Sequence, residues 1–360
     1  MDIQTLFSDL NIVNAVIDRT LQLGLDAIYW KQWGSYLETK TRVFKTHLGT
    51  VTGVVAGSII GQNDQKPLRE RKNLGYGITE IAYLGDRYQM DTDRLSELQD
   101  LIDAYNAAEA GPAQQTAIQN IIDYIVDDYR QVLLAPHKRM DLVVGSMLMT
   151  GKAEVFLDDN KENLELLNID LPFKFLTPAT TDKDKFISYL QKNVQALKPN
   201  YGVFGKMLMS RATFNKNIVG SSEFGTNFKM ILGSNQFYTG SSLITSEMAS
   251  AVFTGIGLPA IEIKDDYVIQ KDGSAAQVYA DDRITLLPSD NVMRMRFHRP
   301  YVATDPVPGR TYAEGEGMQQ ISNYRTEEGR FMEYTVEEIP EFIAPNKIVN
   351  FDLRTMNGVA

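Results

Sequence analysis

The chain has 360 residues, no cysteine and a formal net charge of −10 at pH 7. The absence of cysteine excludes disulfide frameworks, zinc–thiolate sites and thiol catalysis. The negative charge argues against a main surface that grips nucleic acid, since such a surface neutralises phosphates with Lys and Arg. Residues 1–10 contain no basic residue, and the most apolar window, residues 49–61, is too short for a membrane span. We therefore expect a soluble, intracellular protein with no membrane partner.

Residues 1–40 predict an amphipathic helix followed by an aromatic segment. Apolar residues recur at helical spacing at four positions: Leu10, Val13, Ile17 and Leu21. Trp30 and Trp33 are the two tryptophans of the chain. They are candidate anchors of this N-terminal arm against another surface, and ordinary core aromatics are an equal alternative.

Residues 41–90 predict an extended β-hairpin. The stretch from Arg42 to Ile60 is rich in Val, Thr and Gly, and the stretch from Tyr76 to Tyr83 is again typical of a strand. The polar tip between them carries four cations: Lys66, Arg69, Arg71 and Lys72. Because an isolated two-stranded hairpin is at best marginally stable, we expect it to lie on another surface, such as a neighbouring subunit.

Residues 91–151 predict the longest helical tract of the chain. One apolar stripe begins at Leu95 and ends at Gly111-Pro112. A second begins at Ile118 and reaches Gly151, and Pro136 is expected to kink or interrupt it.

The rest of the chain predicts mixed structure. Residues 152–178 should be extended, residues 185–197 should form an amphipathic helix, and residues 199–280 should mix short strands with helices. Period-two alternation then predicts three closing strands, which we expect to form one long sheet: Met293 to His298, Met332 to Glu337 and Val349 to Leu353. The fold class is therefore α+β.

Two glycine-rich segments come close to nucleotide-binding motifs but fail in detail. Gly145 to Ala153 has one residue too many between the glycines of a phosphate-binding loop, and Ala153 stands where Ser or Thr would hold Mg²⁺. We interpret Gly151 as the C-cap of the preceding helix. Gly255 to Ala260 matches a dinucleotide pattern, but a strand follows where that pattern needs a helix.

No other catalytic or metal-binding constellation emerges. The histidines lie far apart in the sequence, and the acidic pairs lack the spacing of a calcium loop. We find no Gly-x-Ser-x-Gly elbow and no Ser-x-x-Lys pair. We therefore predict no catalytic residue, no cofactor and no metal ligand, and we do not expect an enzyme.

Opposed charges line two of the closing strands. Arg294, Arg296 and His298 alternate with apolar residues on one strand, and Glu333 and Glu337 do so on another. If the strands are neighbours, cross-strand pairs between these charges would fix the register. The alternative is that the two stripes face different subunits.

Three segments carry a resemblance to a known family. They are GSMLMTGKAEV at 145–155, GLPAIEIKDDYVIQKDGSAAQVYADDRITLLP at 257–288 and RFMEYTVEEIPEFIAPNKIVNFDL at 330–353. Together with the order of the predicted elements, they resemble the major capsid proteins of tailed phages, specifically the lambda-type major capsid protein E family with the Hong Kong 97-type fold. The resemblance spans nearly the whole chain.

The resemblance implies a division of the chain into four parts. Residues 1–40 would be an N-terminal arm and residues 41–90 an extended loop that lies over a neighbouring subunit. Residues 91–195 and 286–360 would form a peripheral domain with a long spine helix, and residues 196–285 an axial domain.

It also implies the function. Copies of the chain would self-assemble as pentamers and hexamers into an icosahedral shell that encloses double-stranded DNA without sequence-specific binding. Scaffold and portal proteins would assist, some relatives add a decoration protein, and the mature location would be the virion after assembly in the host cytoplasm. Two alternatives stay open: an encapsulin, which is a cellular compartment of the same fold, and a soluble enzyme with no recognisable motif.

Overall fold

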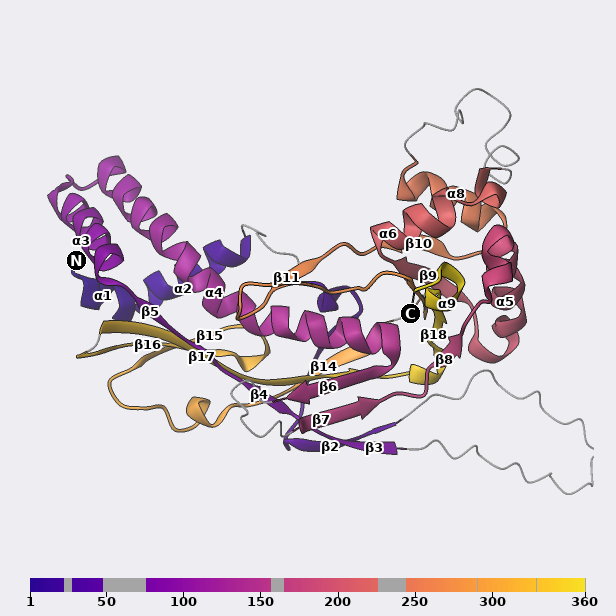
Figure 1. Cartoon of the computed structure of the whole chain (residues 1–360). Helices are drawn as coiled ribbons and strands as arrows, with labels where there is room; N and C mark the ends of the chain where they lie inside the picture. The colour runs from indigo at the N-terminus through magenta and orange to yellow at the C-terminus, as the bar shows by residue number, and fades with distance from the viewer. Residues whose placement is uncertain are drawn as a thin grey trace, which may run out of the picture. The chain divides into compact units, whose positions relative to one another are not determined.

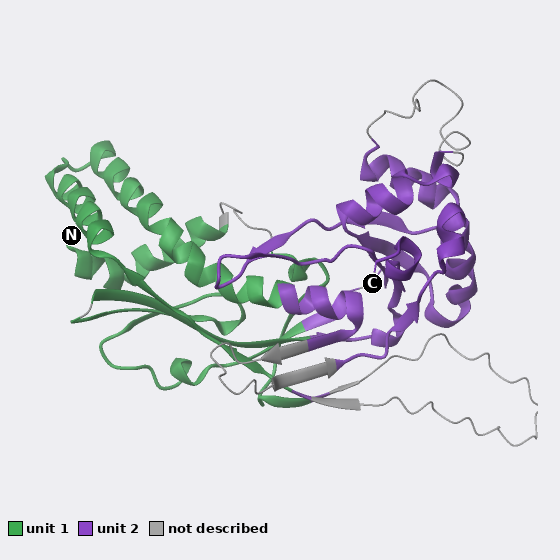
Figure 2. Ribbon diagram, in the orientation of Figure 1, with its two compact units in different colours: residues 1–44, 80–141, 295–340 green, residues 45–79, 142–294, 341–360 purple. Residues whose placement is uncertain are grey.

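The computed structural model describes residues 1–22, 28–47, 76–156, 165–225, 244–289, 291–327 and 329–359. The cations expected at the hairpin tip, Lys66, Arg69, Arg71 and Lys72, lie outside these residues. The chain forms two compact units, each assembled from segments far apart in the sequence (Figure 2). Unit 1 comprises residues 1–44, 80–141 and 295–340, and unit 2 comprises residues 45–79, 142–294 and 341–360.

Unit 1 combines α-helices and short 3-10 helices with a large β-sheet (Figure 1). The sheet order is β1-β14-β17-β16-β15, and β4 and β5 also pair with β17. Its elements are α1 (Ile3–Ser8), α2 (Leu10–Gln22), η1 (Trp30–Gln32), β1 (Gly34–Glu38), β4 (Ala82–Leu84), β5 (Arg87–Met90), α3 (Thr92–Ala107), most of α4 (Pro112–Thr150), β14 (Met293–His298), η4 (Tyr301–Ala303), β15 (Thr311–Glu314), η5 (Glu316–Met318), β16 (Gln320–Thr326) and β17 (Gly329–Phe342).

The core of unit 1 follows the sequence periodicities. Val13 and Ile17 of α2 are buried as predicted, whereas Leu10 and Leu21 at the ends of the same stripe are exposed. The predicted buried face of β17 is confirmed: Met332, Tyr334 and Val336 are all in the core. Alternation of side chains along a strand thus sets which residues meet the helices.

Helix α4 passes through Pro136 without a break. Proline lacks the N–H that bonds to the preceding turn and normally disrupts a helix interior. Here Leu133, Leu134 and His137 around it are buried, so tertiary packing holds the helix together. The helix ends where the sequence predicts, because Gly151 has φ +70° and its N–H donates to the Met147 carbonyl at 2.8 Å.

Unit 2 contains a five-stranded sheet with the order β10-β9-β13-β18-β8, and α5 and α8 contribute to its core. Three two-stranded pairs, β2-β3, β6-β7 and β11-β12, accompany it. The elements are β2 (Val43–His47), β3 (Tyr76–Glu80), β6 (Lys152–Phe156), β7 (Glu165–Asp170), β8 (Lys174–Leu176), η2 (Thr180–Lys185), α5 (Phe186–Tyr201), β9 (Phe204–Met209), α6 (Arg211–Thr213), η3 (Phe214–Val219), α8 (Ser246–Gly255), β10 (Ala260–Ile263), β11 (Tyr267–Ile269), β12 (Ala275–Gln277), β13 (Arg283–Pro288), η6 (Pro345–Lys347), β18 (Val349–Asp352) and α9 (Arg354–Asn357).

The expectation of one sheet for the three closing strands is wrong. Strands β14 and β17 are neighbours in the sheet of unit 1, but β18 lies between β13 and β8 in the sheet of unit 2. Val349, Asn350 and Phe351 are all buried, so β18 is covered on both faces and occupies a central position in its sheet. Strands β15 and β16, between the predicted strands, were not anticipated by the sequence pattern.

Two further predictions concern smaller elements. The paired strands β2 and β3 confirm the base of the predicted hairpin. The strand expected after Gly257 is present as β10, which removes the dinucleotide motif from consideration. The four-part division of the chain into arm, loop, peripheral domain and axial domain stays a prediction.

Candidate functional site

Both candidate anchor residues, Trp30 and Trp33, lie inside unit 1. Each indole is nearly or fully buried within the chain itself. The Trp30 ring stands edge-on to Tyr36 with centroids 5.1 Å apart, and Trp33 stands edge-on to Tyr29 at 4.5 Å. This placement corresponds to the alternative interpretation, in which the tryptophans are core aromatics. A contact of this arm with another subunit stays a prediction.

Glu333 of the acidic stripe on β17 has partners other than those expected. Glu333 accepts hydrogen bonds from Ser322 and Tyr324 at 3.0 Å each and forms an ion pair with Arg310. Arg310 comes from the connection before β15, which the sequence pattern did not assign to this sheet. The ion-pair partner of Glu333 within the chain is therefore Arg310, not Arg296.

Glu337 joins the two predicted strands through a histidine. Its Oε2 lies 2.7 Å from His298 Nδ1 on β14 and 3.4 Å from Arg42 Nε. The guanidinium of Arg296 instead lies over the Phe44 ring at 4.9 Å. Arg294 is exposed on β14. Pairing of these charges between subunits stays a prediction.

A cluster of buried polar groups in unit 1 escaped sequence reasoning. It centres on Glu338 of β17, which is fully buried. His137 and Asp141 reach it from α4, and Tyr36 and Lys31 lie on its other side. The signal was present in the pair Glu337-Glu338, because consecutive residues of a strand point to opposite faces, and both of these carboxyls are buried. Glu338 shares its face with buried Val336, so it was the one to single out.

The electrostatics of this cluster follow from burial. Loss of solvation raises the pKa of Glu338 to about 8, with Asp141 adding to the rise and Lys31 opposing it. Burial lowers the pKa of His137 to about 3, and the charges of Lys31 and Lys138 act in the same direction. Burial also raises the pKa of Tyr36, with the charge of Glu338 contributing. At neutral pH the carboxyl and the imidazole are therefore both uncharged.

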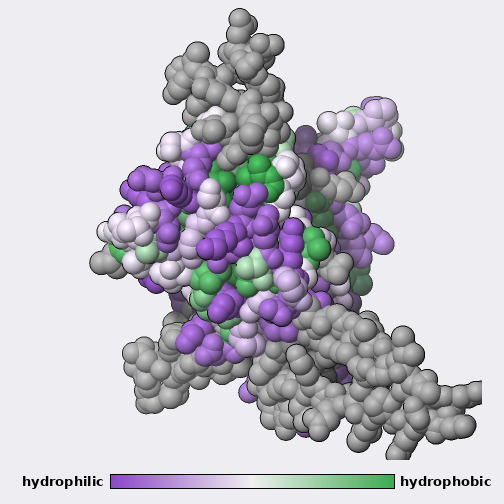
Figure 3. Space-filling model, turned by 90° about the vertical axis from the view of Figure 1, so that its right-hand side faces the viewer, coloured by the Kyte–Doolittle hydropathy of each residue, from purple (hydrophilic) through white to green (hydrophobic). Residues whose placement is uncertain are grey.

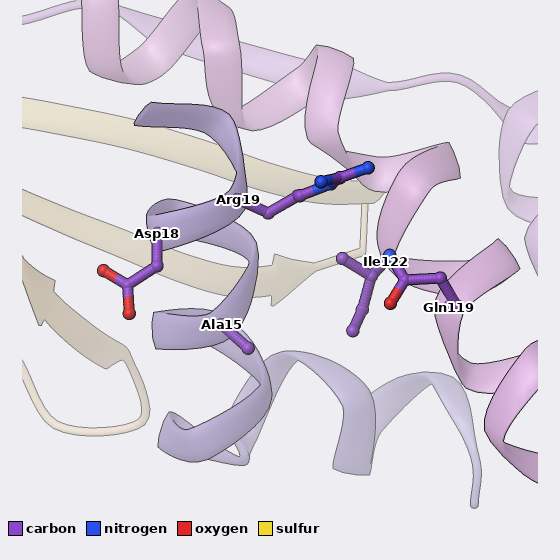
Figure 4. A pocket seen from close by; sticks show the side chains of 5 residues that line it. All are labelled: Ala15, Asp18, Arg19, Gln119 and Ile122. Atoms are coloured by element: carbon purple, nitrogen blue, oxygen red, sulfur yellow. The ribbon is translucent and has the colours of Figure 1, made fainter. Parts of the chain in front are cut away.

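A groove between α2 and α4 is the candidate pocket of unit 1. Ala15, Asp18 and Arg19 line it from α2, and Gln119 and Ile122 line it from α4. Figure 4 shows the Arg19 side chain extending toward α4 while Asp18 points away from it. Arg19 Nε is paired with Asp123 Oδ1 at 3.5 Å, and both side chains are largely exposed. The groove is open and its cation already has a carboxylate partner, so it does not define a ligand site.

The surface of unit 2 presents isolated apolar side chains. Tyr267 and Ile269 of β11 are 60% and 78% exposed, and Val268 between them is buried. Figure 3 shows one face of the molecule, on which hydrophilic side chains surround small groups of hydrophobic ones. Such a face is typical of a folded protein surface.

No cluster of three or more His, Asp or Glu side chains among the described residues has the geometry to bind a metal ion. In the same residues, no helix combines the length and apolarity needed to cross a membrane.

Sequence comparisons do not place the chain in a family. No known family profile matches it, and no curated protein matches it. Solved structures do match, and they define the class: the chain has the fold of a phage capsid protein.

The similarity that establishes this is to the protein described as the "putative capsid protein of prophage" from Escherichia coli CFT073. It has a TM-score of 0.56 and 14% sequence identity, and covers 96% of this chain and 98% of that one. A phage-related protein of Bordetella bronchiseptica RB50 has a TM-score of 0.46 at 10% identity, covering 96% and 98%. The mature capsid of bacteriophage PhiM1 has a TM-score of 0.44 at 10% identity, covering 91% and 88%. The fold conclusion rests on the first of these.

Proposed function

We propose that this chain is the major capsid protein of a tailed phage, whose copies self-assemble into the icosahedral shell around double-stranded DNA. The observation that carries the proposal is the fold match with the E. coli prophage capsid protein, which covers 96% of this chain and 98% of the other. A match of this extent leaves almost no part of the chain for an additional domain. A structural role without catalysis accounts for the whole length.

The charge of the chain fits a container for DNA. A net charge of −10 disfavours tight, nonspecific contact with phosphates. The protein would thus enclose DNA without sequence-specific contacts and without a cofactor. Its final location would be the virion, after assembly in the host cytoplasm with scaffold and portal proteins and, in some shells, a decoration protein.

The predicted parts acquire roles in such a shell. Residues 41–90 would lie over a neighbouring subunit, with the cations Lys66, Arg69, Arg71 and Lys72 as contacts. Residues 91–195 and 286–360 would form the peripheral domain and residues 196–285 the axial domain. The closed shell would be built from pentamers and hexamers in the Hong Kong 97-type arrangement.

The outer face of β11 fits a contact between copies. Tyr267 and Ile269 project from the same side of the strand, since Val268 between them is buried. Strand β11 pairs only with β12 among the described strands, so this ribbon has little support of its own. We infer that a second copy covers this face in the shell.

Electron microscopy of the purified chain, under conditions that favour assembly, tests the proposal. Closed shells or rings of five or six copies are expected. A chain that stays a stable monomer at high concentration would contradict it. The contents of shells recovered from cells separate the remaining alternative, because a phage shell holds DNA and an encapsulin holds a protein cargo.

A surface variant tests the β11 contact separately. Ile269→Ser should reduce shell formation and leave the isolated chain folded, because the side chain is 78% exposed. Gln270→Ser, at the next exposed position, is the matched control and should assemble normally. Equal assembly of the two variants would remove β11 from the interface and leave the capsid proposal standing.

A further inference from the structure

The buried carboxyl of Glu338 lies beneath a short segment that we call the tryptophan segment, residues 29–36. The Trp30 N–H donates to Asp141 Oδ1 at 2.8 Å, which attaches the segment to α4. The Trp30 ring lies 5.1 Å from the Tyr36 ring and 6.1 Å from the His137 ring, measured between centroids. The segment thus forms one wall of the cluster around Glu338.

The polar atoms of this cluster are poorly matched to a charged carboxylate. Neither Oε1 nor Oε2 of Glu338 has a hydrogen-bond partner among the described residues, and the Tyr36 hydroxyl also has none. His137 Nδ1 lies 4.0 Å from Oε1, beyond hydrogen-bonding distance. Lys31, at the rim, is engaged by Glu316. Buried groups of this kind are stable when neutral and costly when ionised.

Among the elements around Glu338, we expect the tryptophan segment to have the lowest free energy of displacement. Strand β1, which contains Tyr36, is at the edge of the sheet in the order β1-β14-β17, whereas β17 has partners on both sides. The turn η1 has only three residues. Because β1 has a neighbouring strand on one side only, we infer that water reaches Glu338 by displacement of this segment, with exposure of Trp30 and Trp33, before α4 or β17 moves.

We propose that Glu338 is a proton-operated latch for the tryptophan segment. The protonated carboxyl keeps residues 29–36 docked on α4 and β17. Ionisation of the carboxyl requires water and favours release of the segment. The latch is a property of unit 1 alone and does not depend on the proposed capsid function.

The direction of the pH dependence follows from the titrating groups that face the site. The pKa of Glu338 is raised from 4.5 to about 8 in the docked state, so docking loses stability as pH rises through this window. The pKa of His137 is lowered from 6.5 to about 3, so docking loses stability as pH falls below 6.5. Lys31 and Tyr36 from the segment and Lys138 and Asp141 from α4 are the other ionisable groups at the site.

The two effects cancel between pH 4.5 and 6.5 and separate above that range. From pH 6.5 to pH 8, Glu338 is the one of these two groups whose protonation differs between the docked and the released state. The equilibrium constant for release of the segment should therefore rise by about 30-fold over this range. Above pH 8 it should level off, because the carboxyl is then ionised in both states. A rise followed by a plateau is the signature of the latch.

Hydrogen exchange of the full-length chain, corrected for the intrinsic pH dependence of exchange, tests the proposal. The reporters are the hydrogen-bonded amides of Trp30, Gln32 and Trp33. Their protection should fall about 30-fold between pH 6.5 and pH 8 in the wild-type protein. A wild-type profile that is flat across this range would overturn the proposal without reference to any variant.

Two variants assign the effect. Glu338→Gln mimics the protonated carboxyl and should make protection independent of pH above 6.5. Glu38→Gln removes an exposed carboxyl from β1 and should keep the wild-type profile. Persistence of the pH dependence in Glu338→Gln would also refute the latch. Because both tryptophans lie in the segment, buried-type fluorescence shows that each variant retains the docked fold.

Discussion

Replacement of Gly145 by alanine should destabilise unit 2, although helix propensity alone predicts the opposite. Gly145 lies inside α4, where alanine is favoured over glycine by about 1 kcal/mol. A Cβ placed at this position would lie 2.1 Å from the Val278 carbonyl oxygen and 2.9 Å from Val278 Cγ1. The chain beside β12 therefore packs directly on the backbone of α4.

The clash cannot be relieved by a side-chain rotation, because the nearest atom belongs to the backbone. The Val278 N–H donates to the Asp266 carbonyl at 2.9 Å, and the Tyr279 hydroxyl is within 2.7 Å of Thr285 Oγ1. These bonds hold the clashing segment on both sides. Overpacking typically costs about 1–3 kcal/mol, and a backbone shift of this size lies at the upper end. After the gain in helix propensity, we expect a net loss of about 2 kcal/mol.

Equilibrium urea unfolding followed by circular dichroism measures this loss as a lower midpoint at an unchanged slope. Asn120→Ala, at an exposed position of the same helix, is the control and should be neutral or slightly stabilising. Val278→Ala should not rescue Gly145→Ala, since it leaves the carbonyl oxygen in place. If the Gly145→Ala variant is as stable as the wild type, α4 and the chain at Val278 do not approach each other as closely as described.

Three further outcomes follow from named contacts. Thr285→Val removes a buried hydroxyl that bonds to a helix carbonyl and two side chains, and urea unfolding should show a loss of about 2 kcal/mol, with Thr285→Ser milder. Arg310→Ala breaks the partly buried ion pair with Glu333 and should lower the free energy of unfolding by about 1 kcal/mol in low salt and by less in high salt. An equal loss of stability at both salt concentrations would contradict an ionic contribution. In a Glu338→Gln background, stability should fall as pH drops below 6.5, because His137 binds its proton only when unfolded. A flat acid limb in thermal unfolding of that variant would contradict the burial of His137.

The predictable elements of this fold are those in which the apolar face given by the sequence period is also the face buried in the structure. The stripe of α5 and the alternation of β17 each place one face in a core, so Leu190 and Met332 are buried as the pattern requires. The end of α4 was predictable for a local reason, since Gly151 adopts a backbone conformation that favours glycine. Local chemistry and periodicity determine such features without reference to distant residues.

The sheet to which a strand belongs is not local information. The segments containing β17 and β18 both alternate, yet they join different sheets. The difference lies in Asn350, which the alternation assigns to solvent but which is buried and accepts a 2.5 Å hydrogen bond from Thr285. A polar residue can occupy a core position when a distant residue supplies its hydrogen bond. That partner cannot be identified from the spacing of apolar residues along one strand.

The same limit explains why Arg310 was not foreseen as the partner of Glu333 and why Glu338 was not singled out. Charged residues are rarely buried, so the alternation of β17 alone does not mark Glu338 as a buried carboxyl. Glu338 is buried because its raised pKa keeps the carboxyl neutral. The desolvation free energy of the ionised form makes its burial sensitive to pH. A buried carboxyl whose oxygens have no hydrogen-bond partner among the described residues is a poor choice for stability alone, since an apolar residue of similar size would avoid the penalty. Its presence beneath an edge segment therefore argues for a role in releasing that segment, which the Glu338→Gln exchange profile decides.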